Sequence, residues 1–302
     1  MSDNTNTSPR TILSHTSQLG EGPVWDSKRQ TIIWVDILNG IIHEYSPTQK
    51  QYRTIATPSM VGAVALKPDG NLIAALQNGL AFVDRTSGAI SMLHDPESHL
   101  PGNRFNDGKC DPGGRFWVGS MSLAEEQGAG NLYMIDNNLT TVLKIPGVSI
   151  SNGLAWSPDH STFYYIDTPT REVWAFDYDL QTGNIANKRV VIRIPETEGS
   201  PDGMTIDREG MLWIAHWDGW QISRWDPGHG EQLLSIRLPV ARVTSCTFGG
   251  PDLQHLYITS ARVGLTTGQL AQQPLAGSLF VIENFGYQGL PAHEFDHQQK
   301  EQ

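Results

Sequence analysis

The sequence predicts an all-β protein, folded as a six-bladed β-propeller with a metal site on its central axis. One phrase returns six times along the 302 residues, at intervals of about 40 to 50 residues. Each copy joins a short apolar run to a Pro, Asp or Gly turn and a strand rich in aromatic residues, and no segment shows a helical hydrophobic period. The six copies begin at Glu21, Val61, Asp107, Asn152, Asp202 and Ser245.

Each copy is followed by segments with the composition of β-strands. The first expected strand after each copy covers, in order, Thr31–Asp36, Leu72–Leu76, Phe116–Ser120, Thr162–Asp167, Leu212–Trp217 and His255–Ser260. A further strand is expected in three of the copies, at Gly40–Tyr45, Asn131–Ile135 and Glu172–Tyr178. One small sheet cannot bury both of its faces, so six such sheets are expected to pack face to face around an axis.

A propeller ring also needs its first and last sheets to be joined, because an open sheet edge invites pairing with other chains. The segment Arg10–His15 is interpreted as a closing strand that pairs with the last repeat near Ser278–Glu283. We therefore expect a polar N-terminal tail over residues 1–9 and a single propeller domain over residues 10–302.

Charge and composition exclude several classes of partner. The formal net charge of −11 argues against nucleic acid, which is bound by clustered Lys and Arg. The first nine residues lack the pattern of a secretory signal and no apolar run could span a membrane, so a cytoplasmic protein without a membrane partner is expected. The two cysteines, Cys110 and Cys246, lie in different repeats and are expected to be buried free thiols.

The residues that lead the repeats indicate the functional site. The first strand of each blade lines the channel of a propeller, so equivalent positions should form a ring around the axis. That ring would hold the carboxylates of Glu21, Asp107 and Asp202. Carboxylates in a narrow channel repel one another unless a cation lies among them. The competing interpretation is that Asp and Asn before glycine are ordinary turn residues.

The donors in this ring are all oxygens, which favours Ca²⁺, Mg²⁺ or Mn²⁺ over metals that prefer softer ligands. We expect Glu21, Asn152 and Asp202 to hold the ion. Three protein ligands leave positions open for water and substrate, which is the pattern of a catalytic metal site.

Four phrases in this order resemble the regucalcin (senescence marker protein)/gluconolactonase family. They start at Leu19 (Leu-Gly-Glu-Gly-Pro-Val-Trp-Asp), Asn103 (Asn-Arg-Phe-Asn-Asp-Gly-Lys-Cys), Ser151 (Ser-Asn-Gly-Leu-Ala-Trp) and Pro201 (Pro-Asp-Gly-Met-Thr-Ile-Asp). The stretch that begins at Val243 is similar to the bacterial sugar-lactonase members. The resemblance covers nearly the whole chain, from about Leu19 to Pro291.

The resemblance implies a six-bladed propeller that hydrolyses a sugar lactone with one divalent ion. Its metal ligands fall on the three residues that the repeats already indicate, and the identity of the ion stays open among Ca²⁺, Mg²⁺, Mn²⁺, Zn²⁺ and Fe²⁺. Its substrate-binding residues fall on Arg104 and Asn106, and an aspartate of its water network falls on Asp107. Some members carry a glutamate on the following loop, where this chain has Ala124 with Glu125 and Glu126 beside it.

These residues suit the opening of a 1,4- or 1,5-aldonolactone to its aldonic acid in carbohydrate oxidation. Asp202 is expected to act as general base, and Arg104 to share the developing negative charge. The loop Ser122–Gly130 is expected to form a lid that selects substrate size. Two alternatives stay open: a related propeller hydrolase of esters or organophosphates, and a non-catalytic calcium-binding propeller.

Overall fold

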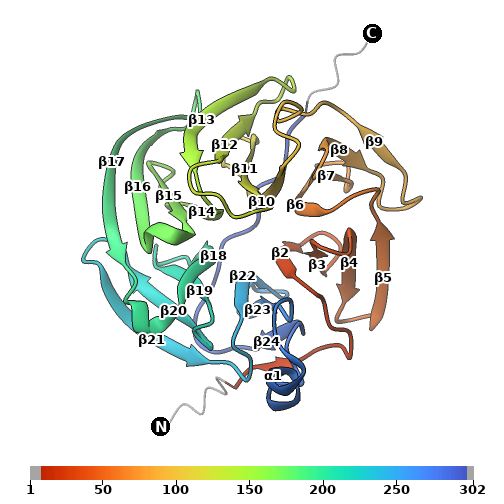
Figure 1. Cartoon of the computed structure of the whole chain (residues 1–302), viewed down its shortest axis with the longest axis vertical. Coiled ribbons are helices and arrows are strands. Elements are labelled where there is room, and N and C mark those ends of the chain that lie inside the picture. Colours follow the sequence, from red (N-terminus) through yellow and green to blue (C-terminus); the bar gives the residue numbers. More distant parts are fainter. Residues whose placement is uncertain (1–7, 298–302) are drawn as a thin grey trace.

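A computed structural model describes residues 8–297 and contains six four-stranded antiparallel sheets arranged around a central axis (Figure 1). The predicted six-bladed β-propeller is therefore confirmed. Within blades 1 to 5 the strands follow chain order from the axis outward, and blade 6 is completed by a strand from the N-terminal end.

The first three blades each hold four strands, ordered from the axis outward. Blade 1 contains β2 (Gly20–Asp26), β3 (Thr31–Asp36), β4 (Ile41–Ser46) and β5 (Gln51–Ala56). Blade 2 contains β6 (Val61–Leu66), β7 (Leu72–Leu76), β8 (Gly79–Val83) and β9 (Ile90–Met92). Blade 3 contains β10 (Asn103–Cys110), β11 (Phe116–Ser122), β12 (Gly130–Ile135) and β13 (Thr141–Val148).

The remaining three blades follow the same plan. Blade 4 contains β14 (Ser151–Trp156), β15 (Thr162–Asp167), β16 (Glu172–Asp179) and β17 (Asn184–Arg193). Blade 5 contains β18 (Ser200–Ile206), β19 (Leu212–Trp217), β20 (Gln221–Asp226) and β21 (Glu231–Arg237). Blade 6 contains β22 (Val243–Gly249), β23 (His255–Ser260), β24 (Phe280–Ile282) and β1 (Arg10–Thr11).

The ring closes through the N-terminal strand, as predicted. Arg10 pairs with Val281 and Thr11 with Phe280 in an antiparallel register. The closing strand is shorter than the predicted Arg10–His15, because the ladder ends after Ile12 donates to the carbonyl of Leu279 at 3.2 Å. Of the expected N-terminal tail, residues 1–7 lie outside the described residues.

The sequence shows no helical hydrophobic period, and the described residues contain one short α-helix. A six-residue helix, α1 (Thr267–Gln272), lies in the connection between β23 and β24. A capping box holds its start, with the Thr266 side chain accepting from the Gln269 amide. Six residues are fewer than two turns, which is too short for a helical period to be visible in the sequence. Among the described residues, no helix is long and apolar enough to cross a membrane.

Every innermost strand has an irregular register against its neighbour at the residue that leads the repeat. These shifts occur between Glu21 and Val24, Val61 and Ala63, Phe105 and Gly108, Asn152 and Leu154, Pro201 and Met204, and Val243 and Ser245. A β-bulge turns a side chain away from the regular alternation of a strand. In every blade the shift therefore lies at or next to the lead residue.

The segment after β24 crosses one end of the channel. It runs across the middle of the ring from blade 6 toward the side where blades 2 and 3 meet (Figure 1). It meets the end of the innermost strand, or the turn after it, in every blade. The contacts, in blade order, are Lys28–Glu294, Leu66–Phe295, Gly114–Asp296, His160–His293, Arg208–Gln288 and Leu253–Gly289. We call residues 288–296 the C-terminal strap.

Candidate functional site

Four blades bring the predicted polar residues to the axis. Glu21 extends from β2, Asp107 from β10, Asn152 from β14 and Asp202 from β18, and each is between 3% and 5% exposed. The glycines after Asn152 and Asp202 allow neighbouring innermost strands to approach closely. At Gly153, for example, a Cβ atom would lie 2.9 Å from the backbone oxygen of Asp202. The bulges and glycines together form a narrow, polar channel.

The arginine and the amides form one hydrogen-bonded chain. Arg104 Nη1 donates to Asn106 Oδ1 at 2.6 Å. Asn106 Nδ2 donates to the Ser151 carbonyl at 2.8 Å and to Asn152 Oδ1 at 3.3 Å. Asn152 Nδ2 donates to Thr168 Oγ1 at 2.9 Å. Each amide is thus held in one orientation, and the Asn152 oxygen lies on the side of the channel where Asn106 lies.

Burial makes the channel carboxylates weak acids. It raises the pKa of Glu21 to about 8, with a further rise from the nearby charge of Asp107. Burial and the charges of Glu21 and Asp107 raise the pKa of Asp202 well above its usual value. Glu21 and Asp202 lie close enough for each to affect the pKa of the other. Two adjoining carboxyl groups that hold protons in this way are poised to exchange them for a cation.

Arg104 lies among these acids and stays charged. Burial lowers its pKa to about 10, while the charges of Glu21, Asp202 and Glu125 act in the opposite direction. Glu125 belongs to the exposed loop between β11 and β12, which was the expected lid. Its charge reaches Arg104, so this loop lies at the Arg104 end of the channel.

The sequence reasoning assigned no role to Lys109, which the structure places next to the carboxylates. Its ammonium donates to the carbonyl of Met204 at 2.8 Å, and its pKa is lowered by burial but supported by Asp107 and Glu21. The signal was present in the phrase Asp107-Gly-Lys109. On a β-strand, a lysine two residues after a channel aspartate points to the same side of the sheet. This alternation could have identified Lys109 as a channel residue.

The donor set fits a divalent ion. Glu21 and Asp202 supply two adjoining buried carboxyl groups, and Asn152 supplies an oriented amide oxygen. These are the hard oxygen donors that Ca²⁺, Mg²⁺ and Mn²⁺ prefer. Asp107 adds a third buried carboxyl group beside them. Its Oδ1 accepts from the Gly108 amide at 2.8 Å, and burial raises its pKa while the nearby charge of Lys109 acts in the opposite direction.

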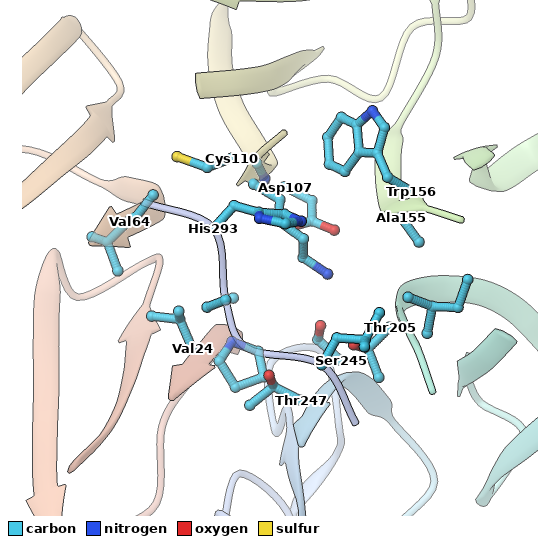
Figure 2. Close-up of a pocket in the computed structure, with 18 of the residues that line it drawn as sticks. Val24, Val64, Asp107, Cys110, Ala155, Trp156, Thr205, Ser245, Thr247 and His293 are labelled. Carbon is cyan, nitrogen blue, oxygen red and sulfur yellow. Dashed lines mark hydrogen bonds between the residues drawn. The ribbon is translucent and has the colours of Figure 1, made fainter. Parts of the chain in front are cut away.

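A cavity of about 80 Å³ lies further along the channel. Its walls come from all six innermost strands, from positions at or after the lead residues, and from strap residues 290–293 (Figure 2). Lys109 and His293 both line it. The strap crosses this end of the channel, whereas Arg104 and the Glu125 loop lie toward the opposite end.

Both cysteines have the environment that was predicted. Cys110 and Cys246 are buried and unpaired with each other. Burial raises the pKa of Cys246 to about 12, so this thiol stays protonated at neutral pH. Burial likewise raises the pKa of Cys110 well above its usual value.

Comparison with known proteins gives consistent results. The family model described as SMP-30/Gluconolactonase/LRE-like region matches residues 19–262. Regucalcin of Danio rerio is 40% identical over 286 residues, covering 94% of this chain and 97% of that protein. A predicted sugar lactone lactonase of Bacillus subtilis, YvrE, is 39% identical over 275 residues, covering 90% of this chain and 94% of that protein.

Solved structures give the same fold. A calcium-binding protein from Agrobacterium tumefaciens, regucalcin, superposes with a TM-score of 0.91 at 30% identity, covering 95% of this chain and 97% of that one. A luciferin-regenerating enzyme superposes with a TM-score of 0.90 at 31% identity, covering 95% of this chain and 98% of that one.

Proposed function

Because this chain belongs to the SMP-30/gluconolactonase/LRE-like family, we propose that it is a hydrolase of cyclic esters that opens a sugar aldonolactone to the aldonic acid. The family resemblance seen in the sequence motifs is confirmed by these relatives. The observation that carries the proposal is the buried Arg104–Asn106 pair next to the Glu21–Asp202 carboxyl pair. A polyhydroxylated substrate needs fixed polar partners of this kind, whereas an apolar ester does not.

Glu21, Asn152 and Asp202 are the residues that would hold a divalent ion. Such an ion supplies Lewis acidity toward the lactone carbonyl and lowers the pKa of a coordinated water. Asn152 suits an anchoring role because its amide nitrogen is already engaged by Thr168. Glu21 suits the same role because its Oε2 accepts from the Gly22 amide at 2.8 Å, which fixes the carboxylate.

Asp202 is the proposed general base. It accepts a proton from the attacking water while the water oxygen bonds to the lactone carbonyl carbon. When the bond from that carbon to the ring oxygen breaks, the proton held by Asp202 passes to the ring oxygen, which leaves as a hydroxyl group. Burial raises the pKa of Asp202, and a less acidic carboxyl group is the stronger base toward the proton of the water.

Arg104 and Asn106 are the proposed substrate-binding residues. The Arg104 guanidinium donates hydrogen bonds in a fixed fork and can share the negative charge that develops on the carbonyl oxygen. The Asn106 oxygen holds Arg104 at 2.6 Å, so part of its contribution is to orient the arginine. Asp107, which lies near the charge of Lys109, is proposed to hold water next to the substrate by hydrogen bonds.

The test is proton release at neutral pH from chelated protein and from the same protein after reconstitution with single divalent ions. The panel contains pentono- and hexono-lactones, with an aryl ester and an organophosphate as controls. Metal-dependent acid release on one or two sugar lactones supports the proposal. Turnover of the controls alone would favour an ester or organophosphate hydrolase. Silence on every substrate, with calcium still bound, would favour a calcium-binding propeller.

A further inference from the structure

A second cluster of metal-binding side chains lies away from the channel, where the N-terminal segment meets blade 1. Among residues 8–297, His15, Asp36 and His43 form the one group of three His, Cys, Asp or Glu residues whose donor atoms all lie within 4.8 Å of one another. Asp36 ends β3, His43 lies on β4, and His15 belongs to the segment between β1 and β2. That segment joins blade 6 to blade 1.

The two imidazoles of this cluster each have a nitrogen without a partner. Nε2 of His15 and Nε2 of His43 are both buried and make no hydrogen bond. The whole side chain of His43 is buried, with 0% exposure. A buried polar atom without a partner costs free energy, and two such atoms in one place indicate a missing common partner.

Hydrogen bonds and ring stacking to neighbouring residues hold the side chains of His43 and Asp36 in place. His43 Nδ1 is hydrogen-bonded to the Tyr52 hydroxyl at 2.8 Å, and the ring stacks on Trp34 with centroids 4.8 Å apart. The Asp36 carboxylate accepts from the backbone amides of Gln18 at 2.8 Å and Leu19 at 3.2 Å, and from Asn39 Nδ2 at 2.8 Å. A hydrogen bond to the second ring nitrogen is what orients a histidine that binds metal through the first.

We propose that His15, Asp36 and His43 form a second metal site, separate from the channel and selective for a borderline metal such as Zn²⁺. Two imidazole nitrogens and one carboxylate oxygen suit Zn²⁺, whereas the oxygen donors of the channel suit harder ions. Three protein ligands leave the fourth tetrahedral position to a water molecule. The inference is independent of the proposed lactone hydrolysis.

The site lies where the ring of blades closes, so a bound metal would affect the stability of the fold. His15 follows the strand that completes blade 6, while Asp36 and His43 belong to blade 1. A metal bound by all three would join the closing segment to the first blade. It would therefore stabilise the ring at its seam, since a ligand that binds only the folded state raises the stability of that state.

The experiment is Zn²⁺ and Co²⁺ binding by the chelated full chain, compared with His15→Gln. His15 is the ligand of choice because it lies outside the packed strands and is only half-buried. His229→Gln is the matched control, an exposed histidine hydrogen-bonded to Asp226 at 2.8 Å. The Asp202→Ala background weakens the channel site, so that the second site can be counted alone.

In that background we expect one tightly bound Zn²⁺, a visible Co²⁺ spectrum of imidazole ligation, and a rise in the unfolding temperature on adding Zn²⁺. His15→Gln should weaken this binding by more than about 100-fold, because even the outer partners of a metal ligand are worth 10- to 100-fold. With an intact channel site, His15→Gln should leave lactone turnover unchanged. If His15→Gln and its control bound Zn²⁺ with equal affinity and showed an equal rise in unfolding temperature on adding Zn²⁺, the proposed site would be wrong.

Discussion

Asn106 Nδ2 lies 3.3 Å from Asn152 Oδ1, so the residue predicted to bind substrate also touches a residue predicted to bind metal. The same Asn106 accepts from Arg104 at 2.6 Å. Asn106 thus connects the proposed substrate-binding and metal-binding parts of the candidate site. It should orient both the Arg104 guanidinium and the Asn152 amide.

Asn106→Ala should therefore reduce both kcat/KM on a lactone and divalent-ion affinity. The Arg104 guanidinium loses its fixed acceptor and the Asn152 amide loses a donor that orients it. A loss of about 10- to 100-fold is expected, the range found for outer partners of metal ligands. Steady-state kinetics and metal titration measure the two effects. Asn138→Ala, at an exposed turn, is the control. If Asn106→Ala raised KM but left kcat and metal affinity unchanged, Asn106 would contact only the substrate.

The sequence predicted the ring well because the repeats encode it locally. Strands such as β3 and β7 have the predicted bounds, since each is a short apolar segment between clear turn residues. The lead residues could also be placed, because equivalent positions of repeated units are equivalent in space. Segments that lie outside the repeats and connect distant blades could not be placed by this equivalence. The His15, Asp36 and His43 cluster depends on the path of a single non-repeated segment.

The strap was missed for the same physical reason. Residues 288–296 have no strand or helix periodicity, and their contacts reach residues as distant in sequence as Lys28 and Leu66. Lys109 was passed over because a lysine on a strand is usually interpreted as solvent-exposed. Lys109 lines the cavity that strap residues 290–293 also line, and the path of the strap across the channel is set only by the three-dimensional fold.

Without a metal ion in the channel, the stability of the protein should fall as pH rises. In the chelated protein Glu21 holds its proton until its pKa of about 8, whereas the unfolded chain releases that proton near 4.5. Between these values the folded state binds more protons, so the free energy of unfolding decreases with increasing pH. The raised pKa values of Asp107 and Asp202 act in the same direction. Thermal unfolding of chelated protein from pH 5 to pH 8 measures the slope.

Glu21→Gln provides the control for this pH dependence, because an amide cannot ionise. Its stability should vary less with pH than that of the wild-type chain, and saturating divalent ion should reverse the wild-type slope by displacing the protons. A wild-type unfolding temperature that is constant or rises over this range without metal would contradict the raised pKa of Glu21.

Substitutions at Asp202 should separate metal binding from proton transfer. Asp202→Ala should abolish turnover and weaken metal binding, because a carboxylate ligand and the proposed base are lost together. Asp202→Asn keeps an oxygen donor, so it should retain more metal than activity, with kcat reduced by about 10²- to 10⁴-fold. Metal titration and kcat on the same preparations give the comparison. An active Asp202→Asn enzyme would exclude the general-base role.

The strap should hold the ring together through Phe295. Its side chain is fully buried among residues of blades 2 and 3, and its amide donates to the Leu66 carbonyl at 2.7 Å. Phe295→Ala should lower the free energy of unfolding by about 3 to 5 kcal/mol, the usual cost of removing a buried phenylalanine. Urea unfolding measures the change, with Leu275→Ala at an exposed site as control. A loss no larger than that of the control would show that the strap is dispensable for stability.

The loop between β11 and β12 should govern substrate choice rather than metal binding. The charge of Glu125 reaches Arg104, but the proposed ligands Glu21, Asn152 and Asp202 come from other blades. Deleting Glu125–Gly128 should therefore change the ratio of kcat/KM values between small and large lactones while metal affinity is kept. Glu125→Gln separates the charge from the loop itself, because it leaves the backbone in place. Equal losses on every lactone, together with weaker metal binding, would show that the loop supports the whole site and does not select the substrate.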